Sequence, residues 1–124
     1  MILCDTNILI ELYKANPKVI QPLQAIGSSN IAVSVITQAE LLYGAKDKQE
    51  LNQLIQHLSH CTNYAVNENI SALFIQLMTR YSLSHKTSIP DMLIAATAIT
   101  QNIQLYTLNI KDFKFIPELT LYIP

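Results

Sequence analysis

Residues 2–10 read ILCDTNILI, so a single carboxylate, Asp5, interrupts an otherwise apolar stretch. The apolar residues before Asp5 have the length of a buried strand, and those after it begin a helix. Burying a carboxylate without a partner costs several kcal/mol, so its place at a strand end needs a physical reason. Two reasons remain open at this point: Asp5 caps the following helix, or it belongs to a functional site.

The rest of the chain alternates short apolar runs with helical patterns. Strand-length runs are predicted at 1–4, 31–33, 64–66, 103–106 and 120–123. The clearest helix is predicted over 68–81, with Asn67 as its cap, and a second over 51–58, after the capping residue Asp47. Strands that alternate with helices predict an α/β fold with a parallel sheet, in which ligands gather at the carboxyl ends of the strands.

Composition limits the classes of protein that this chain can belong to. The 124 residues contain no Gly/Ser-rich linker or internal repeat, which predicts one domain over 1–124. The net charge is -1 and Arg80 is the single arginine, which excludes a strongly basic nucleic-acid footprint. No apolar run approaches the roughly 18 to 20 residues of a membrane span, so we expect a cytoplasmic protein that does not enter the membrane. The isolated cysteines Cys4 and Cys61 fit a reducing compartment, with Cys4 as a core residue.

Three further segments carry polar groups where a strand ends or a helix begins. They are SVITQAELLYG at 34–44, SIPDMLIAATA at 88–98 and TLNIKDF at 107–113. Each has an ordinary structural explanation beside a functional one. Glu40 has the spacing of a capping box with Thr37, Asp91 suits the first turn of a helix, and Asn109 and Asp112 are common turn residues.

Together with Asp5, these groups would form a rim of oxygen ligands at one edge of the sheet. Carboxylate and water oxygens are the ligands that Mg²⁺ and Mn²⁺ prefer, and Mg²⁺ commonly bridges to phosphate. Such an ion can activate water and stabilise charge on a phosphoryl oxygen. The pattern therefore indicates a metal-dependent reaction on a phosphodiester.

These four segments resemble the four motifs of PIN-domain ribonucleases, most closely the VapC toxins of bacterial toxin–antitoxin pairs. The resemblance runs from the first residues to FIPEL at 115–119, in order along the chain. It implies a three-layer α/β/α sandwich with a mostly parallel central sheet. It also implies a homodimer that uses Mg²⁺ or Mn²⁺ to cleave a structured RNA, such as a tRNA or ribosomal loop, and a cognate VapB-like antitoxin that blocks the site.

The resemblance assigns roles to individual residues. The catalytic and metal-ligating acids would include Asp5, Glu40 and Asp91. The fourth ligand would be either Asp112 or Asn109, and we favour Asp112 because it is ionised. Thr6 and Thr107 would supply supporting hydroxyls.

Residues beside the acidic motifs have weaker functional interpretations. Lys46, Lys86 and Lys111 could contact phosphates or be ordinary surface lysines, and Tyr13 and Tyr43 could stack on bases or be buried against the core. His57, His60 and Cys61 lack a second ligand pair, so we expect a solvated helix end and no zinc site.

Two other classes of function compete with a ribonuclease. One is an inactive PIN-like module that binds RNA or a protein, for which Asn109 is the favouring feature. The other is a receiver-like domain phosphorylated on Asp5, which leaves Glu40 and Asp112 unexplained.

Overall fold

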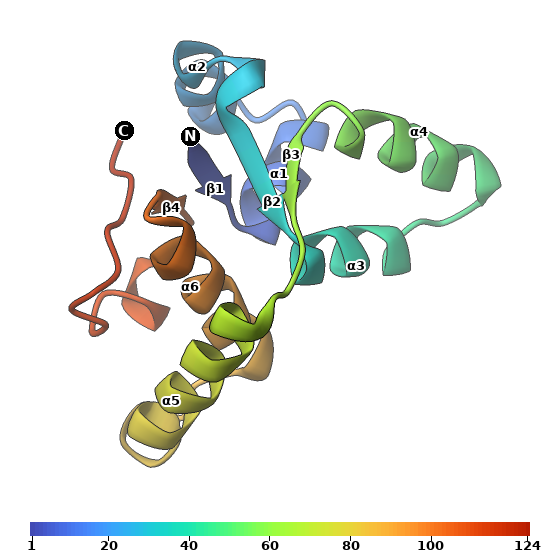
Figure 1. The fold of residues 1–124 in the computed structure, drawn as a ribbon. Helices are drawn as coiled ribbons and strands as arrows, with labels where there is room; N and C mark the ends of the chain where they lie inside the picture. The colour runs from blue at the N-terminus through green and yellow to red at the C-terminus, as the bar shows by residue number, and fades with distance from the viewer.

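A computed structural model describes all 124 residues and contains one four-stranded sheet among six α-helices (Figure 1). Two short 3₁₀ helices, η1 and η2, complete the elements. In chain order these are β1 Ile2–Cys4, α1 Thr6–Tyr13, α2 Pro17–Ile26, η1 Ser28–Asn30, β2 Ile31–Ser34, α3 Val35–Tyr43, α4 Lys48–Leu58, β3 Thr62–Tyr64, α5 Glu68–His85, α6 Ile89–Gln101, β4 Gln104–Tyr106 and η2 Ile110–Asp112. No helix is long and apolar enough to cross a lipid bilayer.

The sheet is parallel throughout and its strand order is β3-β2-β1-β4. The chain moves outward from β1 to β2 and β3, then returns past β1 to add β4 on the other side. The order therefore reverses between β1 and β4, where Cys4 pairs with Tyr106. In open α/β sheets the crevice at such a reversal is the usual ligand site. A receiver-like architecture is wrong for this chain, because that fold has the order 2-1-3-4-5.

Two apolar clusters cover the two faces of the sheet, which confirms the predicted three-layer α/β/α fold. Side chains alternate along each strand, so Leu3 joins one cluster while the next residue, Cys4, joins the other. The first cluster contains residues of α5, α6 and the C-terminal segment, and the second those of α1, α2 and α4 (Figure 1). The predicted burial of Cys4 is confirmed.

The helix caps predicted from the sequence are present. The Asn67 side chain accepts a hydrogen bond from the Ile70 backbone N–H, and the Asp47 side chain accepts one from Glu50. Helix α5 runs to His85, four residues beyond the predicted end, and stops where Lys86 adopts a left-handed conformation.

Two predicted strands differ from those in the structure. The third strand covers Thr62–Tyr64 and not 64–66, because its neighbour β2 ends at Ser34, which pairs with Tyr64, and leaves the following residues no partner. The run at 120–123 forms a single bridge between Leu121 and Leu105. Its partner strand β4 is only three residues long, so it offers few backbone groups with which the segment 120–123 could pair as a strand.

Candidate active site

Asp5 lies at the reversal point of the sheet, directly after β1, and its side chain is only 4% exposed. One carboxylate oxygen accepts a 2.8 Å hydrogen bond from the Thr6 backbone N–H. The other accepts bonds from the Thr107 hydroxyl, at 2.8 Å, and from the Asn7 amide, at 3.3 Å. Asp5 is therefore both the N-cap of α1 and a buried carboxylate held at the carboxyl ends of β1 and β4.

The electrostatic surroundings of Asp5 lack a positive partner. Burial raises the pKa of its carboxyl group, the hydrogen bonds from Thr107 and Thr6 oppose that rise, and the charge of Glu40 adds to it. The two ion pairs of the chain lie elsewhere, between Lys14 and Glu11 and between Arg80 and Glu118. A bound cation would relieve both the burial cost and the repulsion.

Glu40 projects from α3 toward the start of α1. Its Oε1 atom accepts a 2.7 Å hydrogen bond from the Thr6 hydroxyl, whose oxygen also lies 3.2 Å from Thr37 Oγ1. The predicted capping box between Thr37 and Glu40 is wrong. Strand β2 continues through Ser34, whose side chain caps α3 by accepting from the Thr37 N–H at 3.2 Å, so Glu40 falls in the second turn and is free to face Thr6.

Asp91 occupies the first turn of α6, where its backbone N–H donates a 3.1 Å hydrogen bond to the Ser88 hydroxyl. The carboxylate is half-buried, and burial raises its pKa. The hydrogen bond from Ser88 opposes this rise, while the negative charges of the other three acids, Asp5, Asp112 and Glu40, add to it. The charges of the other three predicted acids thus all act on Asp91.

The turn after β4 is tied to the Asp5 segment. Asn109 donates its backbone N–H to the Thr107 hydroxyl at 3.0 Å, and Leu108 donates its N–H to the Asn7 side chain at 3.2 Å. Asn109 is exposed, whereas Asp112, at the end of η2, is half-buried. Asp112 also contributes negative charge at Asp91, whereas Asn109 is a neutral amide.

The donor set fits a hard divalent cation that keeps some of its own water. All four acids offer oxygen ligands, and no three His, Cys, Asp or Glu side chains lie close enough together to hold an ion by themselves. Mg²⁺ commonly binds through one or two carboxylates and retains several waters, so a loose set of acids suits it better than a closed cage. The remaining coordination sites would be open to water or phosphate.

The lysines and aromatic residues named from the sequence lie on different elements of the fold. Lys46 follows α3, Lys86 ends α5 and Lys111 lies within η2, and all three are exposed. Tyr43 is 93% exposed, so its predicted burial alternative is wrong. His57 contacts the Tyr13 hydroxyl, and no zinc-type cluster forms around it.

Two residues of the site were missed in the sequence. Asn7 bridges the Asp5 carboxylate and the Leu108 backbone, and the buried Ser34 supports Thr37 beneath Thr6. The signal for Asn7 was its position as an amide directly before the apolar run 8–10. The signal for Ser34 was the cap spacing Ser34-x-x-Thr37, which begins three residues before the Thr37-x-x-Glu40 spacing of the predicted capping box.

The chain is similar in sequence to proteins of a known family. The family model described as PIN domain matches residues 2–118. The chain is 33% identical over 122 residues to "Ribonuclease VapC19" of Mycobacterium tuberculosis, covering 96% of this chain and 97% of that protein. It is 35% identical over 124 residues to "Ribonuclease VapC2" of Rickettsia felis, covering 94% and 92%.

Solved structures of similar proteins are toxin–antitoxin complexes. A chain of a toxin-antitoxin complex from Klebsiella pneumoniae superposes with a TM-score of 0.83 at 32% identity, covering 97% of this chain and 96% of that one. A chain of VapBC2 from Rickettsia felis, bound to a DNA fragment from their promoter, gives 0.82 at 33% identity and covers 98% of each chain.

Proposed function

The chain belongs to the PIN domain family, and we propose that it is a divalent-metal-dependent ribonuclease that acts as the toxin of a toxin–antitoxin pair. The observation that carries the proposal is a buried carboxylate, Asp5, that lies without a positive partner at the reversal point of the sheet. The negative charges of Asp5, Asp112 and Glu40 also raise the pKa of Asp91. None of these four acids forms an ion pair within the chain. The relatives named ribonuclease support the assignment of RNA as substrate.

Asp5 and Asp91 would hold the cation, Mg²⁺ or Mn²⁺. Asp5 is buried and oriented by three hydrogen bonds, so its carboxylate is positioned before any ion binds. Asp91 approaches from the first turn of α6. When bound, the ion would lower the pKa of a water molecule and stabilise negative charge on a phosphoryl oxygen.

Glu40 and Asp112 would handle the attacking water. Glu40 is fixed by the Thr6 hydroxyl, and Asp112 is placed by the turn that follows β4. Either carboxylate could accept a proton from the water as it attacks phosphorus, which is general-base catalysis. The hydroxyls of Thr6 and Thr107 act by orienting Glu40 and Asp5, and they need not contact RNA.

The substrate would be a structured RNA such as a tRNA or ribosomal RNA loop, because proteins usually select RNA by shape and by single-stranded loops. A net charge of -1 gives little long-range attraction for a polyanion. A homodimer that brings Lys86 and Lys111 of two chains around two acidic centres would increase that attraction. Sedimentation that found only monomer at micromolar concentration would remove this part of the proposal.

A cognate antitoxin would be the protein partner, and both would act in the cytoplasm. The similar structures that are toxin–antitoxin complexes support this proposal. The unpaired acids predict that the partner presents a basic side chain to the acidic rim, since a cation there would compete with the metal.

The direct test is cleavage of total RNA by the purified chain with Mn²⁺, with excess EDTA, and after Mn²⁺ is restored. We expect cleavage only when the metal is present. Asp91→Asn should abolish it, and the matched control Glu118→Gln, which alters an exposed acid paired with Arg80, should not. Cleavage that persists in EDTA would contradict metal dependence, and a protein that never cleaves RNA would contradict the ribonuclease.

One observation favours a second candidate, a PIN-like module that binds RNA or protein without cutting it. Asn109, a neutral amide, is exposed at the start of η2, and its side chain makes no capping bond. If the fourth metal ligand must come from position 109, the acidic centre has three carboxylates and one neutral amide. Titration calorimetry distinguishes the two candidates, because an inactive module should show no affinity for Mn²⁺ that depends on Asp5 or Asp91.

A further inference from the structure

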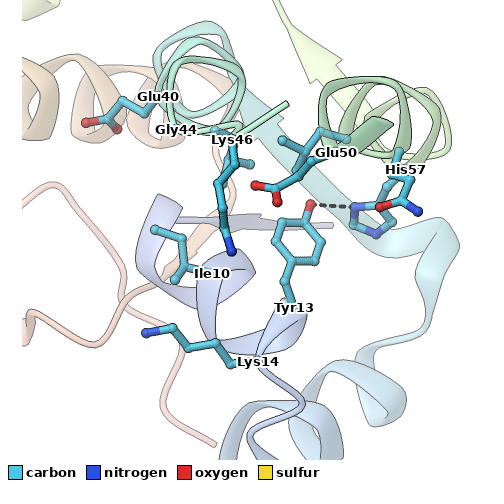
Figure 2. Close-up of a pocket in the computed structure, with 11 residues that line it drawn as sticks. Ile10, Tyr13, Lys14, Glu40, Gly44, Lys46, Glu50 and His57 are labelled. Atoms are coloured by element: carbon cyan, nitrogen blue, oxygen red, sulfur yellow. Dashed lines mark hydrogen bonds between the residues drawn. The ribbon is translucent and has the colours of Figure 1, made fainter. Parts of the chain in front are cut away.

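A cavity of about 800 Å³ opens between α1, α3 and α4, directly beside the acidic centre (Figure 2). Glu40 lines it and is also the acid that Thr6 holds, so the cavity and the proposed catalytic centre share a wall. Ligand pockets for molecules of nucleotide size commonly span about 300–1,000 Å³. A strand of RNA whose scissile phosphate lies at Asp5 and Asp91 would therefore have a neighbouring nucleotide within reach of this cavity.

The inner wall of the cavity carries an ordered aromatic pair. The Tyr13 hydroxyl lies 2.7 Å from His57 Nδ1, and the two rings meet edge to face with centroids 5.3 Å apart (Figure 2). Burial raises the pKa of Tyr13 to about 12 and lowers that of His57, whose pKa the charge of His60 lowers further. Both side chains are therefore neutral near pH 7, and 42% of Tyr13 stays exposed. A fixed, neutral, accessible ring is a suitable surface on which a base can stack.

Polar side chains surround this aromatic pair. Lys46, on the segment between α3 and α4, extends its ammonium group into the space above α1, and Lys14 lies at the end of α1 (Figure 2). Glu50 faces the same space from the first turn of α4. The lysines can contact a phosphate, and the carboxylate can accept a hydrogen bond from a ribose hydroxyl or a base amino group.

We propose that this cavity is a nucleotide subsite for the RNA strand next to the scissile bond, with the base stacked on Tyr13 and its phosphate contacted by Lys46. The inference rests on the proposed ribonuclease function. It commits to RNA as the occupant because the cavity is continuous with the acidic centre through Glu40 and combines an aromatic ring with cations. Because the subsite would bind substrate and transition state alike, its loss should raise KM and leave kcat unchanged.

Two matched pairs of variants test the subsite. Tyr13→Ala is compared with Tyr122→Ala, a half-buried tyrosine that pairs edge to face with Tyr106 outside the cavity, and Lys46→Gln with Lys48→Gln. Binding is measured by fluorescence anisotropy of a fluorescein-labelled single-stranded RNA decamer to each variant in the Asp91→Asn background. Steady-state cleavage is measured with Asp91 intact. We expect Tyr13→Ala to weaken binding about tenfold, in the range found for base–aromatic stacking, and to raise KM similarly, while Tyr122→Ala changes neither.

Tyr13→Phe separates stacking from structure, because it keeps the ring and removes only the bond to His57. It should bind the decamer nearly as well as the parent. Affinity as low as that of Tyr13→Ala would show that the hydrogen bond, and not the ring, matters, and would overturn the stacking assignment.

The outcomes also separate this inference from the proposed function. If the parent binds and cleaves RNA but both matched pairs behave alike, the subsite is wrong and the ribonuclease stands. If the cavity variants lose affinity for a co-expressed antitoxin and keep their affinity for the decamer, the cavity is a protein-docking surface and the subsite is again overturned. A parent that neither binds nor cleaves RNA contradicts the proposed function itself.

Discussion

The Thr107 hydroxyl donates a 2.8 Å hydrogen bond to the Asp5 carboxylate, which joins two buried residues 102 positions apart in the sequence. Thr107 follows β4 and Asp5 follows β1, so the bond spans the two strands between which the order of the sheet reverses. The same hydroxyl oxygen accepts the Asn109 N–H. The orientation of Asp5 therefore depends on the correct pairing of the last strand.

Thr107→Val should reduce RNA cleavage and move its acidic limb to higher pH. The bond from Thr107 lowers the pKa of Asp5 against the effect of burial, so its removal lets that pKa rise further, and more Asp5 is protonated at a given acidic pH. Losing a hydrogen bond to a charged group should also lower the free energy of unfolding by about 1.5–3 kcal/mol. The pH dependence of cleavage measures the first effect and urea unfolding the second.

Thr97→Val is the matched control for that variant. Thr97 is a buried threonine whose hydroxyl bonds only to the Leu93 carbonyl oxygen within α6. It should lower stability without moving the pH profile. Equal shifts of the acidic limb in both variants would contradict the role given to Thr107.

Stability without divalent cations should decrease as pH rises from about 4 toward neutrality. Burial raises the pKa values of Asp5 and Asp91 above the ordinary value of 3.8 in the folded chain, so the folded state holds these protons more tightly than the unfolded state. Their stabilising contribution is fully present below the unfolded pKa and is lost as pH rises through the folded pKa. Asp91→Asn should flatten this decrease in urea unfolding measured at several pH values in EDTA. A difference between wild type and variant that does not change with pH would count against the raised pKa of Asp91.

Millimolar Mn²⁺ should raise the Tm of the wild-type chain. A ligand at ten times its Kd stabilises the folded state by about 1.4 kcal/mol, and here the ion would also relieve the repulsion among the acids. Asp91→Asn should lose most of this gain, whereas Glu118→Gln, which removes an acid paired with Arg80, should keep it. The same shift in both variants would mean that Mn²⁺ binds elsewhere.

The fourth acid can be assigned by comparing Asp112→Asn with Asn109→Ala. Asp112 contributes charge at Asp91, so its neutralisation should lower kcat about 100- to 10,000-fold, in the range of general acid–base effects. Asn109→Ala should cost little, because the Asn109 side chain is exposed. The reverse order of effects would assign the fourth position to Asn109.

The sequence predicted those features that depend on local pattern. Apolar periodicity located α4 and α5, and alternating strands and helices predicted the parallel sheet that is present. The ends of strands depend on their neighbours, which is why β3 was misplaced: nothing near Val66 in sequence shows that β2 stops at Ser34.

The same limit applied to the site. The capping box was misassigned because the start of α3 is fixed by where β2 ends, not by the residues around Glu40. Asn7 was missed because its contact with Leu108 crosses the whole chain. The acids themselves could be identified from the sequence, because a charged residue at the end of an apolar run can be recognised without knowledge of the fold.

Asp5→Asn tests the central claim most directly, because Asp5 is the buried acid around which the other groups are arranged. The purified variant is compared with wild type for cleavage of RNA with Mn²⁺, after circular dichroism has shown the same helical content and a cooperative thermal transition in both. The structure predicts a folded protein whose cleavage falls by at least about 100-fold. Cleavage at the wild-type rate by folded Asp5→Asn protein would contradict the metal-dependent centre proposed for this chain.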